Sequence, residues 1–225
     1  MGCMRDVLQN LTIASRVTDR LREDILTGRL SEGQHITIKE IADIYNVSHM
    51  PVREAFRALE GERLIEIVPY KGAIVRTIDE TFFLEVLGIC DALEAHMTEM
   101  AMEKVGEKEL AELSRINDEI ASLKDTPEDI SRHLELNTAF HDAIFTYAGN
   151  KMAQATHNYY HSLACIVRGR YRHPYERVQQ VVREHEAIIA SMRTKDVFVL
   201  KHAIDEHARN ARQSLVEQYR SEHSN

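Results

Sequence analysis

The chain has 225 residues, a formal net charge of −8, 44% hydrophobic residues and 28% charged residues. This balance argues against a disordered chain, and no apolar run approaches the roughly 18 residues of a membrane-spanning helix. The three cysteines, Cys3, Cys90 and Cys165, lie far apart and form no C-x-x-C pair, which indicates reduced thiols in a cytoplasmic protein.

The charge is unevenly divided along the chain. Residues 1–76 carry 11 Lys and Arg against 11 Asp and Glu, whereas residues 77–225 carry 17 against 25. The excess of negative charge therefore lies in the second part. A neutral first part can still present a basic face, which matters more for nucleic-acid binding than the total charge. We expect two domains, residues 1–76 and residues 77–225.

The first part begins with two expected helices separated by a turn. In residues 13–28 apolar side chains recur on one helical stripe, and a glycine suits the end of the helix. That stripe contains Ile13, Val17, Leu21, Ile25 and Leu26. The stretch RLSEGQHI indicates a turn. A second helix is expected in TIKEIADIY, because Thr37 and Glu40 have the spacing of a capping box.

A third helix is expected in the stretch VSHMPVREAF. Ser48 suits its N-cap, because the hydroxyl can accept a hydrogen bond from a first-turn N–H. Pro51 falls in that first turn, where its missing N–H costs little. Arg53 and Arg57 are four residues apart and share one face. The opposite, buried face is predicted to contain Val52, Ala55, Phe56 and Leu59.

A short hairpin is expected directly after this helix. LIEIV alternates, PYKG is typical of a turn, and AIVR resumes a strand-like run, which together indicate two strands. Helix, helix, short turn, helix and hairpin in this order predict a winged helix-turn-helix. Its third helix is then a recognition helix, whose N-terminus enters the major groove of DNA.

The recognition helix and the hairpin supply the expected DNA contacts. Arg53 is suited to a guanine edge or a phosphate, and Arg57 to a phosphate. Lys71 suits a backbone or minor-groove contact, and Gly72 allows the tight turn. The predicted DNA-binding residues are Lys39, Ser48, His49, Met50, Arg53, Arg57, Lys71 and Gly72. The alternative is a small helical subdomain with solvated arginines.

From about Thr77 the hydrophobic periodicity is helical throughout, and six helices are expected. The fold class is therefore mainly α: an N-terminal winged helix-turn-helix followed by a C-terminal all-α helical bundle. The first long helix of the bundle runs from TFFLEVLGIC to MAMEKV. Its inward side chains are predicted to be Leu84, Leu87, Ala92, Leu93 and Met97.

Several sequence phrases resemble a known family. VSHMPVREA and RLIEIVPYKGAIV resemble the DNA-binding domain of GntR-family transcription regulators. DALEAHMTEMA, NTAFHDAIFTYAGN and EHEAIIASM resemble the FCD-type helical effector domain of the FadR branch. The resemblance implies a homodimeric repressor that binds an inverted-repeat operator on double-stranded DNA. It also implies that a small carboxylate effector, bound in the helical domain, releases the operator.

The same resemblance implies a metal site. In the FCD branch an aspartate and three histidines hold a divalent metal, and the matching positions here are Asn137, His141, His185 and His207. Asn137 departs from this pattern, because a neutral amide supplies no charge and should weaken the site. The three imidazoles suit Zn²⁺ or Ni²⁺. No organic cofactor is expected.

Other departures from the family affect its ligands. His49 and Met50 stand where Arg and Thr are usual, so the operator sequence is open. Cys90 replaces an arginine that is common in the first effector helix. The candidate anchors for an anionic effector are therefore Arg168 and Arg170, with solvated arginines as the alternative.

We interpret the chain as a ligand-responsive regulator that dimerises through the first effector helix, around residues 82–97, and not as an enzyme. The alternative is a metal-dependent enzyme with the N-terminal domain as an interaction module. Glu184 adjoins His185, but helix neighbours point about 100° apart. The sequence contains no nucleophile elbow, phosphate loop or H-E-x-x-H. A third possibility is a regulator with a purely organic ligand cavity and no metal.

Overall fold

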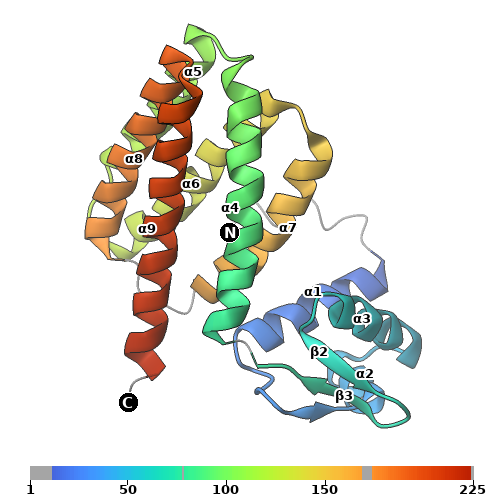
Figure 1. Cartoon of the computed structure of the whole chain (residues 1–225). Coiled ribbons are helices and arrows are strands. Elements are labelled where there is room, and N and C mark those ends of the chain that lie inside the picture. The colour runs from blue at the N-terminus through green and yellow to red at the C-terminus, as the bar shows by residue number, and fades with distance from the viewer. Residues whose placement is uncertain (1–11, 78, 169–173, 224–225) are drawn as a thin grey trace. The chain divides into compact units, whose positions relative to one another are not determined.

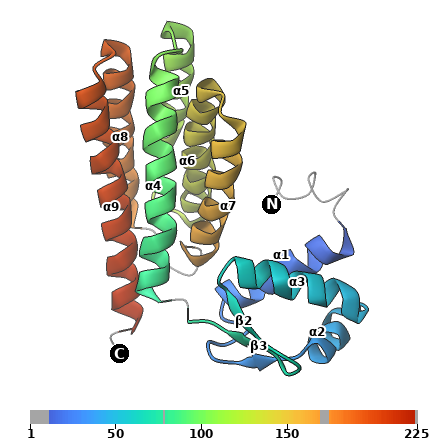
Figure 2. The same cartoon turned by 45° about the vertical axis from the view of Figure 1, so that its right-hand side comes forward.

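The computed structural model describes residues 12–77, 79–168 and 174–223. The chain divides into two compact units, Met1–Thr81 and Phe82–Asn225 (Figure 1). Figure 2 gives a second view of the helices that make up most of the described chain and of the short strands of the first unit. The fold is mainly α, as predicted. Among the described residues, no helix combines the length and the apolar character needed to cross a bilayer.

Three helices form the body of the first unit: α1 (Ile13–Leu26), α2 (Ile38–Tyr45) and α3 (His49–Gly61). The predicted capping box starts α2, because Thr37 Oγ1 accepts the Glu40 N–H at 3.2 Å and the Glu40 carboxylate accepts the Thr37 N–H at 2.9 Å. The α3 helix packs on α1 and α2. Its buried residues are the predicted Val52, Ala55, Phe56 and Leu59.

Two details predicted for this unit are wrong. Ser48 is the N-cap residue of α3, but its side chain makes no capping hydrogen bond. Its hydroxyl is exposed, so water can replace that bond. Ile13 is 59% exposed rather than buried. It is the first residue of α1, and the buried part of the stripe begins one turn later at Val17.

The predicted two-stranded hairpin is confirmed, and a third strand that was not predicted extends it to a three-stranded sheet. The strands β2 (Ile65–Val68) and β3 (Gly72–Val75) pair antiparallel, and β1 (His35–Ile36) pairs with the other edge of β3. The sequence predicted a turn where β1 lies. Two residues are too few for an alternating pattern, so pairing with β3 alone makes this segment a strand.

The second unit is an all-α bundle, as predicted. Its helices are α4 (Glu80–Met102), α5 (Glu107–Ala121), α6 (Pro127–Ala148), α7 (Lys151–Arg168), α8 (Tyr175–Thr194) and α9 (Val197–His223). The α5 helix packs against α6 and α8, and α8 packs against α9 (Figure 1). One hydrophobic core joins these helices, with Met97, Phe140 and Phe145 fully buried. Side chains from helices distant in sequence therefore meet in its interior.

The buried face of α4 differs from the prediction. Leu87 and Met97 are buried and Leu93 is partly buried, but Leu84 is 40% exposed and Ala92 is also exposed. Apolar residues occur around much of the circumference of this helix. Hydrophobic periodicity therefore does not decide which side faces the core.

Gly72→Ala is expected to destabilise the wing more than Gly33→Ala. Both glycines have positive φ, +125° and +70°. A Cβ on Gly72 would lie 2.2 Å from the carbonyl oxygen of Ile36, whereas Gly33 has open space around it. Positive φ alone costs about 1–3 kcal/mol in a residue other than glycine. Gly72→Ala should lose more than this, because β1 must also move away from β3. Urea unfolding of the full-length variants tests the difference, and equal losses would contradict it.

Candidate functional site

The predicted DNA-contacting side chains lie at exposed positions of the first unit. The exposed residues of the predicted set are Lys39, Ser48, His49, Met50, Arg53, Arg57 and Lys71. Gly72 is partly buried and serves the turn of the wing. Met50 is 64% exposed at the first turn of α3.

The arginines of α3 differ from a structural arginine in the same unit. Arg22 of α1 binds the carboxylate of Glu62 with two donors, each at 2.7 Å, and both side chains are mostly buried. Arg53 and Arg57 are exposed, and within the described chain neither makes an ion pair. Their charges are therefore available to an external anion such as a DNA phosphate.

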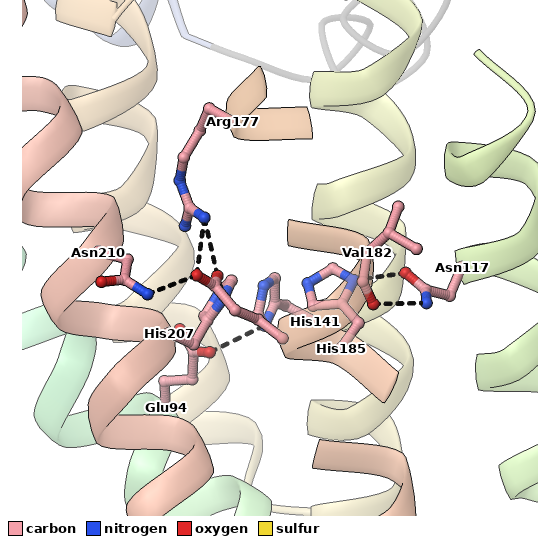
Figure 3. A network of polar contacts seen from close by, with 9 residues as sticks. Glu94, Asn117, His141, Arg177, Val182, His185, His207 and Asn210 are labelled. Carbon is pink, nitrogen blue, oxygen red and sulfur yellow. Dashed lines mark hydrogen bonds and ion pairs between the residues drawn. The ribbon is translucent and has the colours of Figure 1, made fainter. Parts of the chain in front are cut away.

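Three histidines meet in the interior of the second unit (Figure 3). His141 comes from α6, His185 from α8 and His207 from α9, and one ring nitrogen of each lies within 4.8 Å of the others. All three residues are at most 6% exposed. Nitrogens that share one tetrahedral zinc ion lie about 3.3 Å apart, given Zn–N distances of about 2.0–2.1 Å. Small side-chain rotations would bring these imidazoles to that spacing.

A side-chain amide fixes the orientation of His185. Asn117 Nδ2 donates to the Val182 carbonyl at 3.0 Å, so Asn117 Oδ1 faces His185 Nδ1 at 3.1 Å. This network assigns the proton to Nδ1 and leaves a lone pair on Nε2. In the described part of the chain that buried Nε2 has no hydrogen-bond partner. Burial, together with the neighbouring His207 and His141, holds the pKa of His185 well below its usual value, so the ring is neutral at pH 7.

Carboxylates lie beside the other two imidazoles, although only His207 makes a hydrogen bond to its carboxylate. His207 Nδ1 lies 2.7 Å from Glu184 Oε2, and His141 Nδ1 lies 3.0 Å from Glu94 Oε1. A carboxylate on Nδ1 orients the ring and makes Nε2 the metal-binding atom. Burial by itself raises the pKa of Glu94, but the interaction with His141 outweighs it, so the pKa lies well below its usual range.

Glu184 joins the histidine cluster to a buried arginine. Its carboxylate accepts hydrogen bonds from Arg177 Nη1 at 2.8 and 2.9 Å and from Asn210 Nδ2 at 2.7 Å, besides the contact with His207. Burial opposes its ionisation, but the bond to His207 and the charge of Arg177 lower its pKa overall. The carboxylate is fully engaged, which argues against a role as a general base.

A cavity of about 40 Å³ borders the histidine cluster. It is lined by His207, Arg177, His133 and Asn137, among others. Asn137, the fourth predicted metal ligand, is partly buried one helical turn before His141. At about 10–15 Å³ for each water, the cavity has room for about three waters. A larger ligand must therefore widen the space between α6, α8 and α9.

Sequence reasoning missed several residues of this site and misplaced others. Glu94, Asn117 and Arg177 were not predicted, although Arg177 and Glu184 lie two helical turns apart on one face of α8, which is a detectable pattern. The predicted effector anchors remain untested. Arg170 lies outside the described residues, and Arg168 ends α7 with its side chain also outside the description.

A winged helix-turn-helix joined to a helical domain with a polar internal cavity is the architecture of a ligand-responsive DNA-binding regulator. Two family models match the chain: "Bacterial regulatory proteins, gntR family" over residues 13–75 and "FCD domain" over residues 85–210. The chain therefore belongs to the GntR-family transcription regulators that carry an FCD domain, which confirms the family predicted from its sequence phrases.

Named relatives agree with this assignment. The chain is 27% identical to the HTH-type transcriptional repressor RspR of Escherichia coli (strain K12), over 91% of this chain and 89% of that protein. It is 26% identical to the gluconate operon transcriptional repressor of Bacillus subtilis (strain 168), over 84% and 79%. The solved structure of E. coli McbR/YncC has a TM-score of 0.61 at 18% identity, over 93% and 99%, and supports the fold alone.

A separate buried histidine predicts an acid-sensitive stability. His157 of α7 is 3% exposed, and its ring centroid lies 4.5 Å from that of Phe145. Burial lowers its pKa. As pH falls through about 6.5, the unfolded chain gains a proton at this residue that the folded chain binds only at lower pH, so stability is lost.

His157→Leu is therefore expected to reduce the loss of unfolding free energy between pH 7.5 and pH 5.5. The matched control is His202→Leu, because His202 is on the surface with a side chain 78% exposed. Urea unfolding at a series of pH values measures both slopes. A His157→Leu slope equal to that of the wild type would show that this imidazole does not resist protonation.

Proposed function

We propose that the FCD domain holds a divalent metal through His141, His185 and His207, and that a small carboxylate effector binds at this metal. The observation that carries the proposal is the convergence of three buried imidazoles: His185 and His207 have Nδ1 in hydrogen-bond contact with an oxygen, and His141 Nδ1 lies 3.0 Å from the carboxylate of Glu94. An orphaned Nε2 on His185 is costly without a partner, and a metal would satisfy it.

The residues present suit a metal of the zinc or nickel class. Neutral imidazoles bind both ions, and Glu94 and Glu184 supply the carboxylates that metal-binding histidines commonly contact. Asn137 lines the cavity beside His207 and offers an amide oxygen. A metal held by these side chains would provide positive charge for a carboxylate in the cavity.

The effector would act by shifting a population of conformations. The cavity walls come from α6, α8 and α9, so a ligand larger than a few waters favours a state in which these helices are further apart. In a homodimer, operator binding requires a half-site spacing that suits both recognition helices. A ligand that favours a different spacing of the recognition helices would release the operator. The protein would then act as a repressor in the cytoplasm.

The α4 helix is the proposed dimer contact. Leu84 and Ile89 are 40% and 38% exposed on this helix, although both are large and apolar. A second copy of α4 would cover them. A dimer also provides two recognition helices, which tight specific binding to an inverted repeat needs.

Arg53→Ala should weaken specific operator binding by about 1–3 kcal/mol, because it removes a base or phosphate contact at the start of the recognition helix. Arg57→Ala should weaken binding more evenly across sequences and lower the salt slope by about one. Arg115→Ala is the control, since Arg115 is an exposed arginine of α5. Fluorescence anisotropy with operator DNA at several salt concentrations measures these effects. A folded Arg53→Ala variant with wild-type operator affinity would show that Arg53 does not contribute to operator binding.

Chelation should lower the Tm of the metal-loaded protein, because a metal that binds only the folded chain adds about 2.7 kcal/mol at 100 times its Kd. His141→Ala should abolish most of this sensitivity, and His202→Ala should retain it. Asn137→Asp should tighten metal binding by adding a charged ligand. Metal affinity should fall at acidic pH, since protonated imidazole does not bind metal.

Metal content and melting curves of these variants test the site. Wild-type protein that contains no metal and does not respond to Zn²⁺ or Ni²⁺ would refute the metal proposal and favour an organic-effector cavity. If the Asn137→Asp variant binds metal and the wild-type protein does not, this chain has lost the site.

A further inference from the structure

We infer that Arg177 forms a second anion-binding subsite of the cavity and selects effectors that carry a second carboxylate. The inference rests on the proposed function, in which the first carboxylate of the effector binds at the metal. It adds a specificity-determining residue and narrows the ligand class to short dicarboxylates.

Arg177 is a buried cation in the wall of the ligand cavity. It is 6% exposed and lines the cavity together with His207 and Asn137. In Figure 3 the guanidinium of Arg177 points down toward the carboxylate that Asn210 contacts from another side, and dashed lines mark its two bonds, which run to Glu184. One member of the histidine cluster, His207, therefore borders the same space as the guanidinium, and Glu184 contacts both. A ligand in this space can meet the metal at one end and Arg177 at the other.

Arg177 also lines a second, outer groove beside the cavity. A groove of about 380 Å³ between α8 and α9 is bordered by two arginines, Arg177 and Arg183, and by two carboxylates, Glu176 and Glu217, with polar side chains that include Ser214 and Gln213. Of these residues, Arg177 and Ser214 line the inner cavity as well. Arg177 therefore stands between the outer groove and the cavity that His207 lines.

The chemistry of this subsite favours a carboxylate. A guanidinium presents donors in a planar fork that matches a carboxylate, and charge-assisted bonds of this kind are about twice as strong as neutral ones. The second carboxylate would lie at the mouth of the groove, so part of its hydration is retained and the cost of desolvation is limited. The limited volume of the cavity favours a short spacer between the two carboxylates.

Matched ligands on the metal-loaded full-length protein test the inference. Succinate carries two carboxylates, and succinamate replaces one of them with a neutral amide of nearly the same size. Isothermal titration calorimetry should give a Kd for succinate at least tenfold lower than that for succinamate in the wild type. Arg177→Gln should reduce this ratio to about one, mainly by weakening succinate binding.

Two further variants separate recognition from folding and general charge. Arg183→Gln removes a cation that lines only the outer groove, and it should keep the wild-type ratio. Arg177→Lys keeps the charge beside Glu184 but loses the planar fork, and it should give an intermediate ratio. It also supplies the comparison if Arg177→Gln does not fold.

Metal content is measured for every variant before titration, which distinguishes the two possible failures. Wild-type protein that takes up neither Zn²⁺ nor Ni²⁺ overturns the proposed function and this inference together. Metal-loaded wild type without a preference for succinate overturns the inference alone. An unchanged preference in the folded Arg177 variants would also overturn it, by assigning the selectivity to another residue.

Discussion

The carboxylate of Glu184 accepts hydrogen bonds from Arg177, His207 and Asn210 although it is only 7% exposed. A buried charge costs several kcal/mol unless its partners replace water, and removing one partner of a buried pair typically costs about 3–5 kcal/mol. This interaction therefore constrains how α8 packs on α9. It also sets the orientation of the His207 ring, and so it links the stability of the domain to the geometry of the histidine cluster.

The same constraint explains how a small ligand can have a distant effect. The cavity lies between packed helices and holds about three waters, at about 10–15 Å³ for each. Close-packed interiors do not deform continuously, so a ligand that does not fit selects a different packing of α6, α8 and α9. Arg177, Glu184 and His207 would move with these helices, so the proposed effector would change the energy of their contacts. An effector that binds one packing more tightly would shift the population toward that packing.

Sequence reasoning succeeded where a few neighbouring residues decide the structure. The capping box of Thr37 and Glu40 and the buried face of α3 are set within about one turn of a helix. It failed where the structure of a segment depends on residues far away in the sequence. The segment β1, for example, is a strand only because β3 lies beside it. The convergence of the three histidines followed from family resemblance and not from spacing. Asn117, 68 residues from His185 in sequence, had no local signal at all.

Asn137 gives the proposed site a particular electrostatic character. An aspartate at this position would cancel one charge of a divalent metal, whereas the amide of Asn137 cancels none. The metal would then keep both charges among neutral imidazoles, and an effector carboxylate would supply the missing anionic ligand. Metal and effector would therefore strengthen each other's binding, and by linkage the two effects are equal in free energy. A weak metal site is then no defect in a sensor, because occupancy of the site depends on the effector.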